Sequence, residues 1–314
     1  MTEALERTTV TTLTDLVEVV PSLLGFHATD SIVLLAIQDG YVQLTARTDL
    51  VDVPGRGLSA AWRRMPRAQL VLIAYTRDPG LAWSGLDEVD QAIPDGTQRI
   101  LLHADGERWF EHPDDVGTPY DAWGSVHLAE AAYAGRPVRT SREELYLLVE
   151  PRRTPGEVTA SLDRVAERAC VMSDVVGEAL ALLEGHDDQP GDLDIDDATI
   201  LCLASHDEGF LDAALLSTDR GNAATRLSLW LQVVGASVPN CAGGALVGAG
   251  LAAWLTGDGA LQSVCLEALE GRPGPALWVG LLEALNRDAV PPAEWDALCA
   301  DLLEARMEQG PSSS

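Results

Sequence analysis

The stretch LGFHATDSIVLLAIQDGYVQLTART, residues 24–48, predicts how the first half of the chain folds. Residues 31–37 form a continuous apolar run, which is typical of a strand covered on both faces of a sheet. Asp39 and Gly40 follow, and this dipeptide between two strands is a strong signal for a tight hairpin turn. The alternating residues 41–48 predict the second strand. The stretch therefore predicts a β-hairpin whose first strand is buried.

The flanking segments extend this hairpin into a mixed sheet with helices. Strands are expected at 69–75, 98–103 and 107–110, the last two joined by a turn at Asp105-Gly106, and helices at 15–24, 57–65 and 85–93. This order, ββαβαββ after the first helix, with continuous apolar runs in the middle strands, predicts an α/β arrangement in which helices cover the sheet. A helix at 123–134 and a capping-box start at Ser141 follow.

The second half of the chain predicts helices alone. After the proline-rich segment 151–155, helical periodicity is expected over 158–183, 196–216, 223–234, 243–255, 260–269, 276–286 and 292–309. Residues 248–273 resemble one tetratricopeptide-like helical hairpin with a Gly-Asp turn, although one copy fits an ordinary bundle equally well. The predicted class is α+β overall, with an α/β domain at 1–150 and an all-helical domain, a bundle or short solenoid, at 151–314.

Charge and composition exclude several classes of function. The formal net charge is −28, which repels a phosphate backbone or an anionic membrane, so no nucleic-acid or membrane partner is expected. All 21 basic residues are arginine. The absence of lysine excludes P-loop enzymes, protein kinases, Schiff-base enzymes and Ser-x-x-Lys hydrolases, because each needs a lysine at a fixed place.

The sequence gives no sign of export, of a membrane span or of a bound cofactor. The first residues lack a basic start and an apolar core, and no apolar run is long enough to span a bilayer, so a cytoplasmic location is expected. The five cysteines are widely spaced, which favours buried, reduced thiols over a zinc site. The acidic segment 192–203 lacks the glycine and the final glutamate of a calcium loop. Neither a metal nor a cofactor is therefore expected.

His27, Asp30 and Ser31 are the candidate catalytic residues. They are the residue types of a nucleophilic triad, and they precede a strand of a sheet, where ligands gather in α/β proteins. Triads are nevertheless assembled from distant parts of a chain, and Asp, Thr and Ser in turns bond their own backbone. We favour a structural turn here, with the direction of the His27 ring as the open question.

Arg108 and Trp109 are the candidate ligand-binding residues, with His103 and His112 nearby. Arginine and tryptophan are the residue types of interaction hot spots and anion pockets. The alternative is a cross-strand packing pair with an exposed guanidinium, which we favour. His103, His112 and Asp114 match no recognised zinc spacing, so no metal site is expected.

Three segments together resemble one known family, the actinobacterial domain-of-unknown-function family 4192. The segments are PSLLGFH at 21–27 followed by DSIVLL at 30–35, GR at 135–136 with SREEL at 141–145, and WLTGDGAL at 254–261. The resemblance implies an actinobacterial or actinophage origin and implies no activity. This chain has Ala28 where relatives commonly have proline, and residues 110–116 lack the cysteines that relatives often carry there.

From these observations we expect a non-enzymatic interaction or regulatory protein of the cytoplasm, whose helical domain docks a protein partner. The lack of lysine-dependent chemistry, the lack of paired cysteines and the repeat-like hairpin motivate this expectation. The alternative is a lysine-independent enzyme, most plausibly a hydrolase, that uses His27 or His103 with acidic residues of neighbouring loops.

Overall fold

The computed structural model of the chain describes residues 10–53, 58–136, 138–169 and 174–309. The chain divides into two compact units. The first, here called the α/β unit, comprises Met1–Arg142 with Arg287–Ala289, and the second, the helical unit, comprises Glu143–Asn286 with Val290–Ser314. The predicted α+β class, with a mixed sheet followed by a helical part, is confirmed.

The α/β unit is built on a six-stranded mixed sheet with the strand order β2-β1-β3-β4-β5-β6. Only β3 and β4 pair in parallel; every other neighbouring pair is antiparallel. The strands are β1 (Ser31–Gln38), β2 (Tyr41–Asp49), β3 (Gln69–Tyr75), β4 (Arg99–Ala104), β5 (Arg108–Phe110) and β6 (Thr118–Pro119). The helices are α1 (Leu13–Leu24), α2 (Leu58–Arg64), α3 (Pro79–Ala92) and α4 (Val126–Tyr133), with a 3₁₀ turn at Leu50–Asp52.

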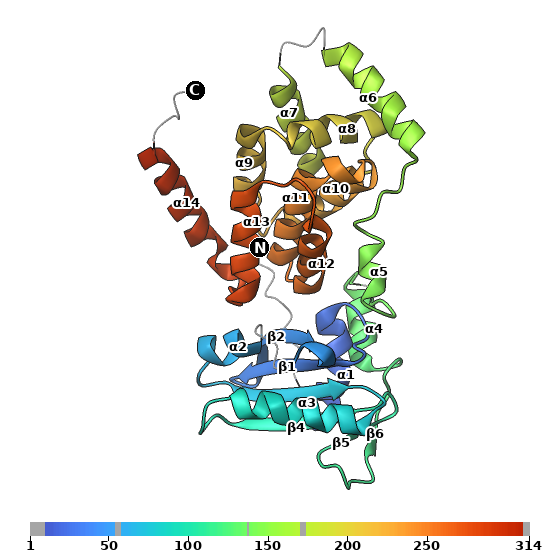
Figure 1. The fold of residues 1–314 in the computed structure, drawn as a ribbon, viewed down its shortest axis with the longest axis vertical. Helices are drawn as coiled ribbons and strands as arrows, with labels where there is room; N and C mark the ends of the chain where they lie inside the picture. Colours follow the sequence, from blue (N-terminus) through green and yellow to red (C-terminus); the bar gives the residue numbers. More distant parts are fainter. Residues whose placement is uncertain (1–9, 54–57, 137, 170–173, 310–314) are drawn as a thin grey trace. The chain divides into compact units, whose positions relative to one another are not determined.

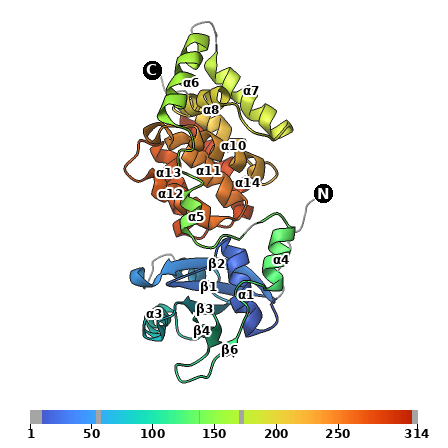
Figure 2. The same ribbon diagram turned by 90° about the vertical axis from the view of Figure 1, so that its right-hand side faces the viewer.

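Both faces of this sheet are covered, as its apolar middle strands predict. Alternate residues of β1 and β3, such as Ile32 and Leu72, pack with α2 and α3, while their neighbours, such as Val33 and Ile73, pack with α1. Figure 2 shows α1 and α3 on opposite sides of the sheet. Because successive strand residues point to opposite faces, a strand buried on both sides is apolar at nearly every position.

The predicted hairpin turns and the end of the first helix are confirmed. Asp39 and Gly40 both have positive φ, 55° and 82°, as the two-residue turn between β1 and β2 requires. Helix α1 begins at a Thr12–Asp15 capping box and ends at Gly25, which has φ of 77°. The helix predicted from residue 85 was placed too late: α3 begins at Pro79, because the Asp78 side chain accepts hydrogen bonds from the first turn. Gly57, the expected start of α2, lies outside the described residues.

The helical unit contains helices α5 to α14 in the part of the chain that the structure describes (Figure 1). They are α5 (Glu143–Tyr146), α6 (Pro155–Ala169), α7 (Val175–Asp188), α8 (Ile195–Ala204), α9 (Glu208–Leu216), α10 (Ala223–Gly235), α11 (Gly243–Leu255), α12 (Gly259–Leu269), α13 (Ala276–Arg287) and α14 (Trp295–Gln309). The hairpin expected at 248–273 is present as α11 and α12, with the turn at Gly257 and a side-chain cap from Asp258.

The prediction of two long helices from periodicity is wrong. The segment expected at 158–183 forms α6 and α7, and the one expected at 196–216 forms α8 and α9. An aspartate begins the second helix of each pair: the Asp174 side chain accepts from Gly177 N–H, and that of Asp207 accepts from Phe210 N–H. Periodicity continues across such a break, whereas the capping side chain marks a new start.

Helix α11 forms the centre of the helical unit. All of its residues from Gly243 to Leu255 are buried, and it packs against α8, α9, α10 and α12. Its small residues allow this close approach. A Cβ atom on Gly248 would lie 2.5 Å from the ring of Trp230 in α10, so only glycine fits at this crossing.

Candidate functional site

His27 lies just after α1, and its ring is engaged in an aromatic stack. The His27 N–H donates to the carbonyl of Arg139 at 3.1 Å, so the backbone is held by the segment that follows α4. The imidazole stacks on the Trp123 indole with the ring centroids 3.8 Å apart and the planes at 28°. Burial lowers the pKa of His27, which favours the neutral imidazole. The ring therefore points to Trp123 rather than to Asp30 or Ser31.

Asp30 and Ser31 point to different surroundings. The Asp30 carboxylate accepts a hydrogen bond of 2.7 Å from the hydroxyl of Thr76, which follows β3. Ser31 is fully buried in β1 and, within the described residues, its hydroxyl has no hydrogen-bond partner. Among those same residues no hydrogen bond joins His27, Asp30 and Ser31 to one another. The arrangement lacks the nucleophile-to-base contact that a triad needs.

Arg108 and Trp109 support the fold around β5. Arg108 Nη1 donates to the carbonyls of Gly117 and Val116, at 2.8 and 3.3 Å, and so closes the loop that leads to β6. Trp109 is 9% exposed, packs in the core on the α1 side of the sheet, and donates from Nε1 to the Thr14 hydroxyl. The structure places both side chains in structural contacts.

His103 is buried, with 3% of its surface exposed. Its Nε2 atom lies 2.8 Å from the carbonyl oxygen of Thr76, and its ring stacks with Phe110 at 5.2 Å. Trp83 contacts it edge-on from α3. His112 lies in the loop after β5, where its N–H donates to Asp115. Among the described residues no group of three His, Cys, Asp or Glu side chains is arranged to hold a metal ion.

The outer side of α4 and the residues just before it expose large apolar side chains. Trp123, Val126 and Tyr133 are 64%, 60% and 97% exposed, and Ala129 is exposed between them. Val126, Ala129 and Tyr133 have the spacing i, i+3, i+7, so they share one side of the helix. We call these four residues the α4 face. The acidic residue Glu130 lies next to Ala129, and its side chain is 66% exposed.

The inner side of α4 buries a histidine beside an alanine. His127 is 7% exposed and Ala131 is 2% exposed, and this side packs against α1. In the described part of the chain neither ring nitrogen of His127 has a hydrogen-bond partner, and Nδ1 lies 3.9 Å from a Glu130 carboxylate oxygen. A surface helix usually presents charged residues to water and apolar ones to the core. Helix α4 departs from this pattern at three positions, because it buries His127 and exposes Val126 and Tyr133.

Both ends of α4 are anchored to the α1 region. Before the helix, Asp121 N–H donates to Glu18 in α1 at 2.9 Å, and the Asp121 carboxylate accepts from the N–H groups of Trp123 and Gly124. After it, Arg139 forms a backbone bridge with Phe26, and Arg139 N–H donates to the carbonyl of Gly25 at 2.8 Å. The α4 face is therefore held in place by its flanking segments.

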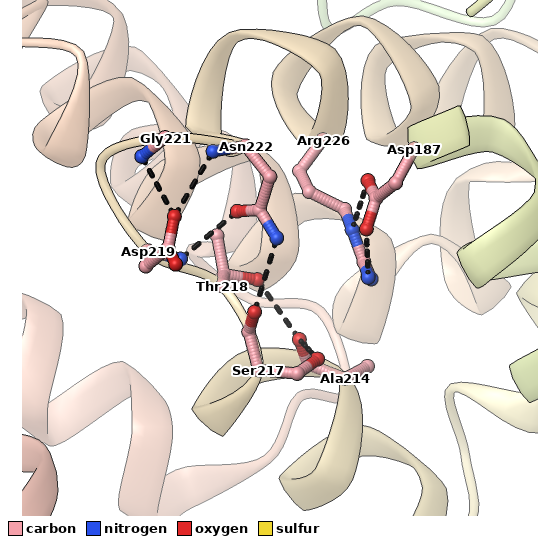
Figure 3. A network of polar contacts seen from close by, with 8 residues as sticks. All are labelled: Asp187, Ala214, Ser217, Thr218, Asp219, Gly221, Asn222 and Arg226. Atoms are coloured by element: carbon pink, nitrogen blue, oxygen red, sulfur yellow. Dashed lines mark hydrogen bonds and ion pairs between the residues drawn. The ribbon is translucent and has the colours of Figure 1, made fainter. Parts of the chain in front are cut away.

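Arg226 in the helical unit is a buried arginine that the sequence did not predict. Arg226 in α10 is 3% exposed and forms a two-pronged ion pair with Asp187 in α7, with distances of 2.7 and 2.6 Å (Figure 3). Figure 3 also shows the adjoining turn, in which Asp219 accepts from the N–H groups of Gly221 and Asn222. The pair balances a charge that would otherwise be buried alone, which is a structural task.

A cavity of about 390 Å³ lies between α6 and the start of α8. It is lined by Arg153, Glu157, Ala160, Arg164, Leu193, Asp194 and Ile195. Its charged groups are engaged with neighbours. Arg164 holds Asp196 with two hydrogen bonds, Asp196 also accepts from the buried Ser161, and Asp194 caps α8. The cavity therefore coincides with the polar joint between α6 and α8.

The remaining sequence expectations concern cysteines and membranes. Cys202 and Cys265 are buried and Cys241 and Cys299 half-buried, all as free thiols; Cys170 lies outside the described residues. Burial raises the pKa of the Cys202 and Cys265 thiols, which keeps them protonated. Across the described ranges, no helix combines the length and apolar character that crossing a bilayer requires.

These observations define a two-unit α+β protein with a covered mixed sheet and an exposed apolar helix face. Residues 14–293 match the family model described as "Domain of unknown function (DUF4192)", which spans most of the chain. The chain belongs to this family, as its sequence segments predict. Neither the curated proteins nor the solved structures show a significant match to it.

Proposed function

We propose that this chain is a non-catalytic protein of the cytoplasm that docks a partner protein through the α4 face. The observation that carries the proposal is the exposure of Val126 and Tyr133 on one side of α4, together with the exposed Trp123 three residues before the helix. Tryptophan and tyrosine are the side chains that most often dominate binding energy at protein interfaces. Contiguous exposed apolar side chains mark interaction sites, whereas scattered ones are normal on any surface.

The location of the docking surface differs from our sequence-based expectation, which placed it in the helical part. Among the described residues of the helical unit, the exposed large apolar side chains are Leu147, Leu203, Leu277 and Leu303, and each belongs to a different segment. Such single residues need no partner. The α4 face offers two aromatic anchors and one β-branched residue together, so it supports docking better.

The geometry gives the alternative hydrolase hypothesis no support. His27 stacks on Trp123, His103 contacts the Thr76 carbonyl, and Ser31 is fully buried. A nucleophile must reach both its base and its substrate. A buried serine without a base meets neither requirement.

The test is co-purification after chemical crosslinking in the native cell with two matched sets of variants. One set carries Val126→Ser with Tyr133→Ser in the α4 face, and the control set carries Leu277→Ser with Leu303→Ser in the helical unit. We expect the unaltered chain and the control to recover the same stoichiometric partner, and the α4-face variant to recover less than about a tenth of it.

Two results would overturn the proposal. One is equal recovery of the partner by the α4-face variant and the control. The other is recovery of no stoichiometric partner by the unaltered chain. The four substituted side chains are each at least 46% exposed, so both variants are expected to fold. Matching circular dichroism spectra and melting temperatures check this.

A further inference from the structure

We infer that the partner segment that docks on the α4 face is basic, with apolar anchors flanked by lysine or arginine. This inference rests on the proposed function and adds the chemistry of the partner. It follows from the charges that border the face and from the charge of the chain as a whole.

Carboxylates border the α4 face near its start and middle. Glu130 lies one position from Ala129 and its side chain is largely exposed. Asp121 lies two residues before Trp123, and Glu18 of α1 is held beside it by the hydrogen bond from Asp121 N–H. A cationic group placed beside the apolar anchors of this face would meet one of these carboxylates.

Two arginines and one histidine lie near these carboxylates. His27 stacks on Trp123, and burial lowers its pKa, which favours the neutral imidazole. Arg136 and Arg139 follow α4, and Arg139 pairs through its backbone with the segment of His27 that lies beside Trp123. The three carboxylates of Glu130, Asp121 and Glu18 outnumber the two arginines, so the surroundings of the face remain acidic.

The charge of the whole chain argues against a second copy as the occupant. Each copy has a formal net charge of −28, so two copies repel each other at long range. The same charge attracts a basic partner and speeds its encounter, with a strong dependence on salt. Charge complementarity therefore selects a basic segment.

The experiment uses the full chain and three short amphipathic peptides with leucine on one side of the helix. The other side carries lysine in the first peptide, glutamine in the second and glutamate in the third. Fluorescence anisotropy of the labelled peptides measures affinity at low and at physiological salt. We expect the lysine peptide to bind roughly tenfold or more tightly than the glutamine peptide, and the glutamate peptide not to bind.

Matched variants separate the local site from bulk attraction. Val126→Ser with Tyr133→Ser is expected to weaken lysine-peptide binding by roughly tenfold or more. Glu130→Gln is expected to weaken it by roughly threefold and to reduce its salt dependence. Glu283→Gln removes the same charge from an exposed position in α13 and is expected to leave the affinity unchanged.

The outcomes distinguish the two proposals. If the lysine and glutamine peptides bind equally and both lose affinity with the α4-face variant, the basic-partner inference fails and the docking surface stands. If the α4-face variant binds every peptide as the unaltered chain does, both fail. Equal effects of Glu130→Gln and Glu283→Gln overturn the inference, because attraction is then unspecific. A concentration-dependent dimer that the α4-face variant abolishes also overturns it, in favour of a second copy.

Discussion

Helices α4 and α11 are both rich in apolar residues, yet one is exposed and the other is buried on every side. In α11 each residue from Gly243 to Leu255 is buried, whereas α4 buries only His127 and Ala131. The difference lies in what packs against each helix. Glycine and alanine around α11 let neighbouring helices approach from all directions, while α4 carries Val126 and Tyr133 on a side that nothing in the described chain covers. Apolar composition alone therefore does not distinguish a buried helix from an exposed one.

The most direct test of this comparison is to replace one valine with serine in each helix. Val247 in α11 is fully buried, and Val247→Ser is expected to lower the free energy of unfolding by about 3 kcal/mol, because it leaves a cavity and buries a hydroxyl. Urea unfolding followed by far-ultraviolet circular dichroism measures this. The control Val126→Ser in α4 is expected to change it by less than about 0.5 kcal/mol. Equal losses at the two positions would contradict the exposed placement of α4.

The second prediction tests the close approach at the centre of the helical unit. Gly248→Ala places a methyl group 2.5 Å from the Trp230 ring, so one helix must shift, at a cost of about 2 kcal/mol. Gly280→Ala in α13 is the matched control, since nothing lies within 4 Å of its new methyl group. That change is expected to stabilise the protein by up to about 1 kcal/mol. The melting temperature is expected to fall for Gly248→Ala and to rise for Gly280→Ala. A rise for both variants would show that α10 and α11 are not in close contact at Gly248.

The third prediction returns to the α4 region. Trp123→Ala removes the ring that stacks on His27, which exposes the imidazole to water. The pKa of His27 is then expected to rise toward its ordinary value, because the burial that lowers it is relieved. The loss of stability is expected to be about 1 kcal/mol or less. Titration of the histidine ring protons by nuclear magnetic resonance, assigned with His27→Gln, measures the shift. An unchanged pKa would mean that Trp123 does not shield His27.

The smallest effect is expected at the polar joint between α6 and α8. Hydrogen bonds from Arg164 and Ser161 lower the pKa of Asp196 from 3.8 to about 2. Because the folded-state pKa is depressed, this contribution is complete above the unfolded value and is lost as the pH falls from there toward about 2.

Asp196→Asn therefore tests the joint through its pH dependence. At neutral pH the variant is expected to lose about 0.5 kcal/mol, since the Arg164 partner is half-exposed. The difference from the unaltered chain should shrink as the pH falls through the window given above. Free energies of unfolding at a series of pH values measure it, and a difference that stays constant in acid would contradict the assignment.

The sequence predicted the sheet well because its signals there are local. The apolar run at 31–37 and the Asp39-Gly40 turn specify β1 and β2 through backbone conformation and burial, without distant partners. The breaks between α6 and α7 and between α8 and α9 were not predicted. Each depends on one capping aspartate inside a segment whose apolar spacing continues.

The candidate site was harder to predict because its defining property is exposure. The spacing of Val126, Ala129 and Tyr133 is the pattern of a core-facing stripe, and only the structure shows that it faces outward. Trp109 shows the opposite case. Its residue type is common at binding interfaces, but here the indole is buried in the core and donates a hydrogen bond to Thr14. The stack of His27 on Trp123 joins residues far apart in the chain, which no local pattern reveals.

The anchoring of α4 at both ends bears on how relatives of this protein can diverge. The preceding segment is held by Asp121 and Glu18, and the following one by the backbone pairing of Arg139 with Gly25 and His27. The outward positions between these anchors contribute little to the core, so mutations there are nearly free of folding constraints. The sequence of this short stretch can therefore change while the sheet keeps its structure.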